Sequence, residues 1–208
     1  MTWLFGRWRT LAVAIVASTL AVGIGVWVSS PATPPATPLA HTLATLDTTT
    51  MTLERAPFCD RVTGADVAAA LGAAPTAETA WKNGDKVPLG STTDVAHEYG
   101  CQWSTADHAA AAWIFAPPVT VAEADTLIDA ATKVEGCTPI AGAPAFGSPS
   151  VALTCGGTVS YRGLYGDAWL VCTLGGPAAV AEVTATAPRW CASVALAAQA
   201  TAAPAADS

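Results

Sequence analysis

Residues 150–175 read SVALTCGGTVSYRGLYGDAWLVCTLG, and this stretch decides the fold. Its β-branched, aromatic and leucine residues form three short runs, separated by Gly156-Gly157 and Gly166-Asp167. Glycine-containing pairs of this kind are typical of tight turns between antiparallel strands. The stretch therefore predicts three strands joined by two hairpin turns, at 150–155, 158–164 and 168–174.

The sequence on either side adds two strands and three helices. Tyr99, Cys101 and Trp103 alternate along one run, as in a strand with one buried face. Residues 73–95 are rich in glycine, proline, threonine and charge, which predicts a long loop. Strands grouped apart from helices are typical of the α+β class, here an antiparallel sheet of about five strands with helices on one face. The additional strands are expected at 97–103 and 111–116, and the helices at 63–71, 120–134 and 178–199, the last interrupted at Pro188.

The N-terminal part of the chain carries its longest apolar run, residues 10–28, which follows Arg7 and Arg9. Nineteen helical residues span about 28 Å, close to the hydrocarbon thickness of a bilayer. The positive-inside rule places residues 1–9 in the cytoplasm and the rest of the chain outside. A cleaved secretory signal is the alternative, although its apolar core is normally only about 7–15 residues long. We expect a single-pass cell-membrane protein with an extracytoplasmic C-terminal domain.

Composition divides the exported part into three segments. Residues 29–54 are dominated by proline, threonine and alanine, which predicts an extended stalk, with a glycosylated or partner-docking segment as the alternative. Residues 55–199 form the expected α+β domain, and residues 200–208 a disordered tail. All 16 acidic residues follow the predicted span. This acidic surface argues against nucleic acid as a partner.

Cysteines are even in number and all follow the predicted span, which indicates disulfide bonds in an oxidising compartment. Pairing of sequence neighbours is preferred, because Cys137 ends a predicted helix and Cys155 ends the next strand. A repeated cysteine–strand–helix pattern in the two halves of the domain would give another pairing. The neighbour pairs are Cys59–Cys101, Cys137–Cys155 and Cys172–Cys191; the repeat would pair Cys101–Cys137, Cys155–Cys191 and Cys59–Cys172.

Catalytic and cofactor motifs are not found in the sequence. His97 and His108 have Asp94, Glu98 and Asp107 near them, but their spacing matches no zinc motif. No phosphate-binding glycine loop and no nucleophile motif precedes a predicted helix. We therefore expect no enzyme, no cofactor and no bound metal. The alternative is an envelope enzyme or a metal-dependent protein that uses His97, His108 and the nearby carboxylates.

One local stretch, Tyr161 to Asp167, combines aromatic and charged residues beside a tight turn. Tyr161, Arg162, Tyr165 and Asp167 are candidates for a recognition patch for a protein partner or a glycan. The preferred interpretation is an ion pair between Arg162 and Asp167, with both tyrosines packed on the sheet. Trp103, Trp113, Trp169 and Trp190 are interpreted as core residues, because small neighbours leave space for large side chains.

Short motifs in the domain resemble those of small exported lipoproteins and membrane-anchored proteins of actinobacteria, grouped as a domain of unknown function. They are Cys59 before a helix that ends Ala70-Leu71-Gly72, then Gly100-Cys101-Gln102-Trp103, and Arg189-Trp190-Cys191 near the end. The resemblance implies a cell-envelope location and an α+β domain with disulfides. It implies no catalytic residues. This chain lacks the cysteine to which lipoproteins attach their lipid, so the apolar segment would anchor it.

Together these observations predict a membrane-anchored, extracytoplasmic protein whose domain binds an envelope protein or glycan without catalysis. A structural accessory subunit of a membrane assembly is a further alternative.

Overall fold

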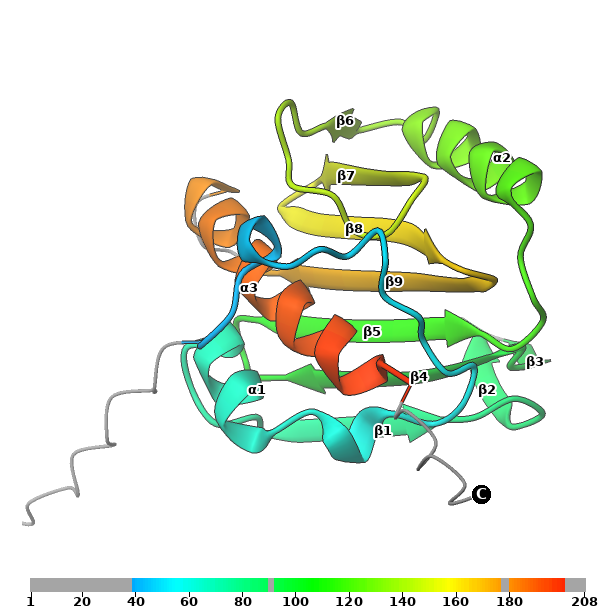
Figure 1. The fold of residues 1–208 in the computed structure, drawn as a ribbon. Helices are drawn as coiled ribbons and strands as arrows, with labels where there is room; N and C mark the ends of the chain where they lie inside the picture. The colour runs from blue at the N-terminus through cyan, green and yellow to red at the C-terminus, as the bar shows by residue number, and fades with distance from the viewer. Residues whose placement is uncertain (1–38, 90–91, 177–179, 201–208) are drawn as a thin grey trace, which may run out of the picture. The chain divides into compact units, whose positions relative to one another are not determined.

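The computed structural model describes residues 39–89, 92–176 and 180–200 (Figure 1). Strands β1, β4, β5, β9, β8, β7 and β6 form, in this order, one antiparallel sheet, and β2 pairs with β3 in a separate hairpin. The α+β class with a large antiparallel sheet is confirmed. The elements are η1 Leu43–Thr45, η2 Cys59–Arg61, α1 Gly64–Leu71, β1 Ala77–Trp81, β2 Lys86–Leu89, β3 Thr92–Val95, β4 Glu98–Ser104, β5 Ala109–Phe115, α2 Val121–Thr132, β6 Cys137–Pro139, β7 Ser150–Cys155, β8 Thr158–Tyr165, β9 Ala168–Gly175 and α3 Val180–Ala198.

The three strands predicted from residues 150–175 are present as β7, β8 and β9. Their turn residues Gly156, Gly157 and Gly166 all have positive φ, which glycine adopts without strain. β9 pairs with β5, so a β7–β8–β9 meander meets a β1–β4–β5 meander at the centre of the sheet. Of the seven strands, β1 and β6 are the two that the sequence did not predict.

Helices cover both faces of the sheet rather than one. Alternate residues of β9 separate the faces: Leu170 and Leu174 belong to the core shared with α3, whereas Trp169 and Val171 pack in a second cluster with α2. The prediction of helices on one face is therefore wrong for α2. Its helical spacing is as predicted, and it begins with a capping box, in which Thr120 and Glu123 bond each other's backbone N–H.

The larger core lies between α1, α3 and the sheet, and its many alanines are supplemented by tryptophans. Trp103 and Trp190 are buried and meet edge to face, with ring centroids 5.6 Å apart. Trp169 is buried on the opposite face, and Trp113 is partly buried beside it. The interpretation of these tryptophans as core residues therefore holds for three of them, and Trp113 is a border residue.

Part of the predicted stalk is folded: residues 39–54 belong to the domain, and residues 29–38 lie outside the described residues. Leu43 and Leu53 are buried in the larger core, and the Thr48 hydroxyl donates to the carbonyl oxygen of Ala145 at 3.0 Å. Leu53 forms a bridge with Gln199 at the end of α3. This segment crosses the α3 side of the domain in Figure 1. The segment is rich in threonine and alanine, so the sequence pattern did not reveal that its few leucines enter the core.

Residues 73–95, predicted to be a loop, contain β1 and the β2–β3 hairpin. The residues of β1 and β3 are almost all exposed, so they lack the alternation of apolar and polar residues on which the prediction depended. Pro188 lies inside α3 without interrupting it, although proline lacks the N–H of a helix bond. Trp190 and Cys191 bury the turn that follows and hold it against the sheet.

Disulfide bonds join the three neighbour pairs. Cys59–Cys101 attaches η2 to β4, Cys137–Cys155 joins opposite residues of β6 and β7, and Cys172–Cys191 joins β9 to α3. They close segments of 42, 18 and 19 residues. Each is expected to stabilise the domain by about 3 kcal/mol, mainly by restricting the unfolded chain.

Within the described residues, no helix is long and apolar enough to cross a membrane. The predicted span at 10–28, the cytoplasmic segment 1–9 and most of the predicted tail lie outside the described residues. The single-pass topology therefore stays a prediction.

Candidate functional site

The sheet face that carries α2 is only partly covered. α2 lies near β6, β7 and β8, and over the β1–β4–β5 part the structure describes no helix. Two adjoining cavities open there, of about 580 and 480 Å³, and they share the side chain of Gln102. Both volumes fall in the range of about 300–1,000 Å³ typical of small-molecule sites. We name the two together the open-face groove.

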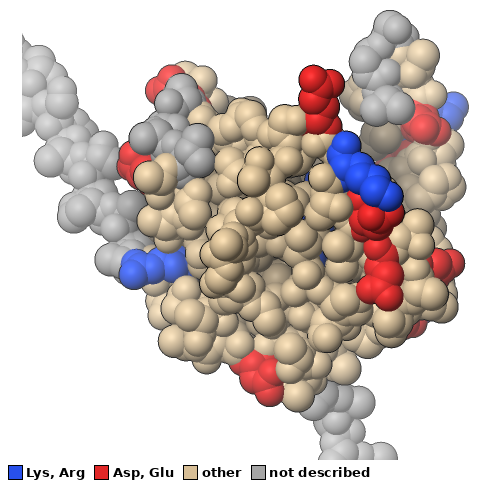
Figure 2. Space-filling model, turned by 90° about the horizontal axis from the view of Figure 1, so that it is seen from above, with Lys and Arg blue, Asp and Glu red and all other residues tan. Residues whose placement is uncertain are grey.

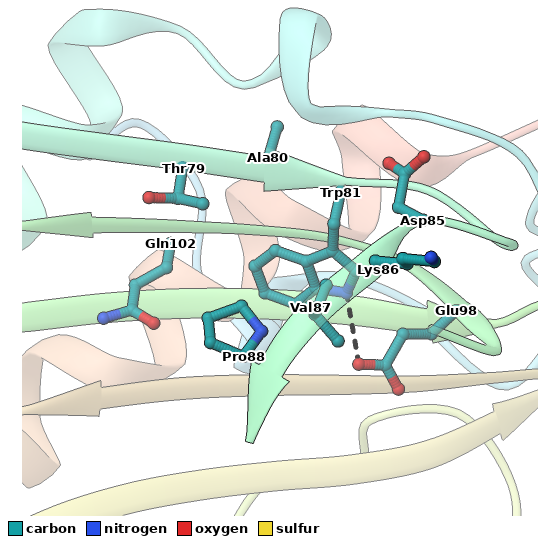
Figure 3. A pocket seen from close by; sticks show the side chains of 9 residues that line it. All are labelled: Thr79, Ala80, Trp81, Asp85, Lys86, Val87, Pro88, Glu98 and Gln102. Carbon is teal, nitrogen blue, oxygen red and sulfur yellow. Dashed lines mark hydrogen bonds between the residues drawn. The ribbon is translucent and has the colours of Figure 1, made fainter. Parts of the chain in front are cut away.

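The first cavity lies between the sheet and the β2–β3 hairpin (Figure 3). At its centre the indole of Trp81, on the last residue of β1, lies over Gly100, its partner in β4. A side chain at Gly100 would overlap the indole ring. The Trp81 N–H donates to Oε1 of Glu98 at 3.1 Å, so the ring is fixed both by contact and by a hydrogen bond. The lining residues are Thr79, Ala80, Trp81, Asp85, Lys86, Val87, Pro88, Glu98 and Gln102.

The β2–β3 hairpin forms one wall of this cavity, and its base is tied to the end of β1. The Gly84 N–H donates to Ala96 O, and the Ala96 N–H donates to Asp85 O, both at 2.8 Å. Asp85 Oδ2 accepts the backbone N–H of Lys82 at 2.9 Å. Gly84 has a φ of +92°, as the tight turn between β1 and β2 requires. The wall formed by Val87 and Pro88 is therefore held by the backbone of the turn.

The sheet surface beneath the second cavity carries small side chains, which leave space above it. Ala111 lies opposite Gln102 on one side and Thr173 on the other, and Ala109 lies opposite Gly175. Polar side chains line the cavity around this surface, and Trp113 closes the end towards α2. They are Gln102, Ser104, Thr105, Asp107, His108, Thr158 and Thr173.

The histidines of the metal hypothesis do not share a site. His97 precedes β4 and His108 precedes β5, so they lie at opposite ends of one antiparallel hairpin. Seven strand residues separate these ends by about 24 Å. Among the described residues, no three histidine, cysteine or acidic side chains are grouped to hold a metal ion. All six cysteines are in disulfides.

The four residues of the predicted recognition patch are not brought together. Tyr161 and Tyr165 are each 2% exposed and pack edge to face on Phe146 in the larger core. Arg162 points to the other face of the sheet, where its Nε donates to Ser160 Oγ at 3.1 Å. Asp167 pairs with Arg55 at 3.2 Å, not with Arg162. Packing of both tyrosines on the sheet, the preferred interpretation, is correct, but the expected ion pair between Arg162 and Asp167 is not formed.

Burial shifts the pKa values of three of these four side chains. It raises the pKa of the Tyr161 and Tyr165 hydroxyls above the ordinary value near 10, and it lowers the pKa of Arg162. Within the described chain, the Tyr165 hydroxyl is the buried side-chain polar atom that has no hydrogen-bond partner. Such a group costs stability, because it has left water without compensation.

Tyr165→Phe is therefore expected to raise the free energy of unfolding by about 1 kcal/mol. The buried phenol of Tyr165 loses its proton only when the chain unfolds. The free energy of unfolding of the wild type therefore falls as the pH rises above about 10, the pKa of an exposed tyrosine. The variant lacks this phenol, so its free energy of unfolding should fall less over the same pH range. Urea unfolding near pH 7 and near pH 10.5 measures both effects. The control is Tyr99→Phe, since Tyr99 is already partly exposed. A variant less stable than the wild type at neutral pH would contradict the prediction.

Trp81 is the site residue that sequence reasoning missed, because it falls in the segment predicted to be a loop. A signal was present: Trp81 is followed by the Asn83-Gly84 turn, and the next strand predicted from the sequence, 97–103, contains Gly100. An aromatic residue opposite a strand glycine is a known way to cover the glycine. Finding it required the strand register, which local periodicity does not give.

Comparisons with protein families, with curated proteins and with solved structures find no match to this chain. The resemblance to actinobacterial exported proteins therefore stays a prediction.

Proposed function

We propose that this chain is a non-catalytic binding domain of the cell envelope, anchored by its N-terminal apolar segment, and that it binds its ligand in the open-face groove. The observation that carries the proposal is the Trp81 indole, which lies partly exposed in a cavity of about 580 Å³. Tryptophan is enriched among the residues that dominate binding energy. A ligand that covers the indole would remove its apolar surface from water.

The chemistry of the groove favours binding over catalysis. Its single histidine, His108, lies in the second cavity, away from Glu98 and Asp85 in the first. One oxygen of each of these carboxylates already accepts a hydrogen bond within the fold. Thiol catalysis has no candidate, because every cysteine is in a disulfide. The groups are thus arranged as a rigid surface for recognition.

The test is calorimetric titration of the full chain with four soluble probes: a neutral hexasaccharide, an uncharged serine- and threonine-rich peptide, hexalysine and a sulfated hexasaccharide. At least one probe should bind with a Kd below about 1 mM, and Trp81→Ala should weaken that binding about tenfold. Circular dichroism checks that the variant is folded.

The control is Thr126→Ala on α2, away from the groove. Thr126 is exposed, and its hydroxyl bonds Ala122 O within the same helix at 2.9 Å, so its loss should leave affinity unchanged. The proposal fails if no probe binds, or if Trp81→Ala binds every probe as the wild type does.

A further inference from the structure

We infer that the ligand of the open-face groove is a neutral oligosaccharide, which lies across strands β1, β4, β5 and β9. This inference rests on the proposed function and names the chemical class of its ligand. Three features carry it: the fixed indole of Trp81, uncharged side chains with hydrogen-bonding groups above the paired strands β4, β5 and β9, and an excess of acidic over basic side chains in the groove.

The indole of Trp81 provides a flat apolar platform. It lies over Gly100, and its N–H is used by Glu98, so the ring cannot turn without losing both interactions. The C–H face of a pyranose ring is flat and apolar as well, and it stacks on such a surface through dispersion and apolar burial. Glu98 and Gln102 flank the indole on opposite sides in Figure 3, where the hydroxyl groups of a stacked sugar would project.

The backbone of β4, β5 and β9 beneath the groove is already paired, whereas β1 is the edge strand of the sheet. β4, β5 and β9 are interior strands, so their N–H and C=O groups bond neighbouring strands on both sides. A ligand on this face therefore bonds to side chains. Gln102 and Thr158 carry amide and hydroxyl groups that both donate and accept, which matches the hydroxyl groups of a sugar. The Thr173 hydroxyl donates to the carbonyl oxygen of Ala111 at 3.5 Å and offers a sugar an acceptor. An extended peptide gains affinity mainly from main-chain bonds at a free sheet edge, which here is β1 and not the face above β4, β5 and β9.

The length of the groove favours several sugar rings over one. It runs from Trp81 on β1 to Thr173 on β9, across three strand spacings of about 4.8 Å, or about 14 Å. The shared Gln102 joins its two cavities. In the second cavity Ala111 places only a methyl group towards the ligand, which leaves space above β5.

Charge in the groove argues against anionic ligands. Among the described residues, Asp85 and Glu98 face Lys86 in the first cavity and Asp107 lines the second, so acidic groups are in excess. Asp85 and Glu98 each already accept one hydrogen bond within the fold. No arginine is found among the described residues that line either cavity, although arginine is the usual partner of sulfate and phosphate groups. On the face of the domain in Figure 2, charged side chains are scattered among uncharged ones and most are acidic. Sulfated or phosphorylated glycans are therefore disfavoured.

The experiment titrates the full chain with neutral gluco-, xylo-, manno- and chito-oligosaccharides, each from the single sugar to the hexasaccharide. A detergent without a sugar headgroup is used, so that it does not compete. At least one hexasaccharide should bind about tenfold more tightly than its monosaccharide. Its affinity should change little between about 0.05 and 0.5 M salt, because no ion pair contributes to binding.

A matched pair of glycine variants tests the platform. Gly100→Ala keeps Trp81 but places a methyl group where the indole lies, so it should weaken binding about as much as Trp81→Ala, roughly tenfold. Gly64→Ala is the control, because a Cβ at Gly64 has no neighbouring atom within 4 Å. If Gly100→Ala does not fold, Gln102→Ala provides a second measurement, with an expected loss of about fivefold.

The outcomes separate this inference from the proposed function. Binding of a neutral hexasaccharide that depends on Trp81 and resists salt supports both. Binding of hexalysine, of the uncharged peptide or of a sulfated glycan in place of neutral sugars, with the same dependence on Trp81, overturns the oligosaccharide and keeps the binding domain. Binding of no probe overturns both.

Discussion

Trp190→Ala is expected to lower the free energy of unfolding by about 4 kcal/mol. The Trp190 side chain is fully buried, packs edge to face on Trp103 and donates its N–H to the carbonyl oxygen of Thr173 at 3.1 Å. Alanine would leave a large cavity between α3 and the sheet, and the carbonyl of Thr173 would lose a bond. The neighbouring alanines are too small to fill the space.

Urea unfolding with the disulfides intact measures this loss, with fluorescence and circular dichroism as independent probes. Trp190→Phe is the graded variant: it keeps an aromatic ring but removes the N–H, and about half of the loss is expected. Val134→Ala is the control, because Val134 is 52% exposed and its truncation should change stability by less than about 0.5 kcal/mol. A loss below about 1 kcal/mol for Trp190→Ala would show that α3 is not held by this contact.

The centre of the sheet was predictable because its residues combine several signals that agree. Residues 150–175 have alternation, β-branched side chains and glycine turns, and they form β7, β8 and β9. α2 was predictable from its spacing and from Thr120 at its start. In each case the local sequence and the buried face are consistent, so no tertiary information was needed.

The edges of the domain were not predictable in this way. β1 is exposed along almost its whole length, so burial leaves no pattern in its sequence AETAW. Residues 39–54 enter the core through isolated leucines in a polar segment, and only the fold brings them to α3 and the loop before β7. The side of the sheet on which α2 packs depends on its connections, which periodicity does not specify.

The candidate site illustrates the same limit. Tyr161 and Tyr165 looked like recognition residues because tyrosine often lies at surfaces, but alternation along β8 turns both into the core. Trp81 was overlooked because its importance comes from Gly100, a residue 19 positions later that β-pairing places opposite it. A site made by strand register cannot be read from short-range spacing alone.

Gly163→Ala is the second change with a large expected effect, a loss of about 3 kcal/mol of stability. An added Cβ at Gly163 would overlap the carbonyl oxygen of Phe146 and lie 3.0 Å from the Cβ of Ser150. The contacting atom is backbone, so it cannot move aside as a side chain would. The surrounding segment is also fastened to β8, because Ser148 N–H donates to Leu164 O at 2.7 Å and Leu164 N–H donates to Pro149 O at 3.1 Å.

Relief of this overlap requires the segment before β7 to move away from β8. That movement would withdraw the fully buried Phe146 from its edge-to-face contacts with Tyr161 and Tyr165. Gly64→Ala is the matched control: its Cβ meets open space at the first residue of α1, so stability should stay equal or rise by up to about 1 kcal/mol. Urea unfolding of the two variants makes the comparison. Equal stabilities would mean that the Phe146 segment yields freely, and that its hydrogen bonds to β8 do not hold it in place.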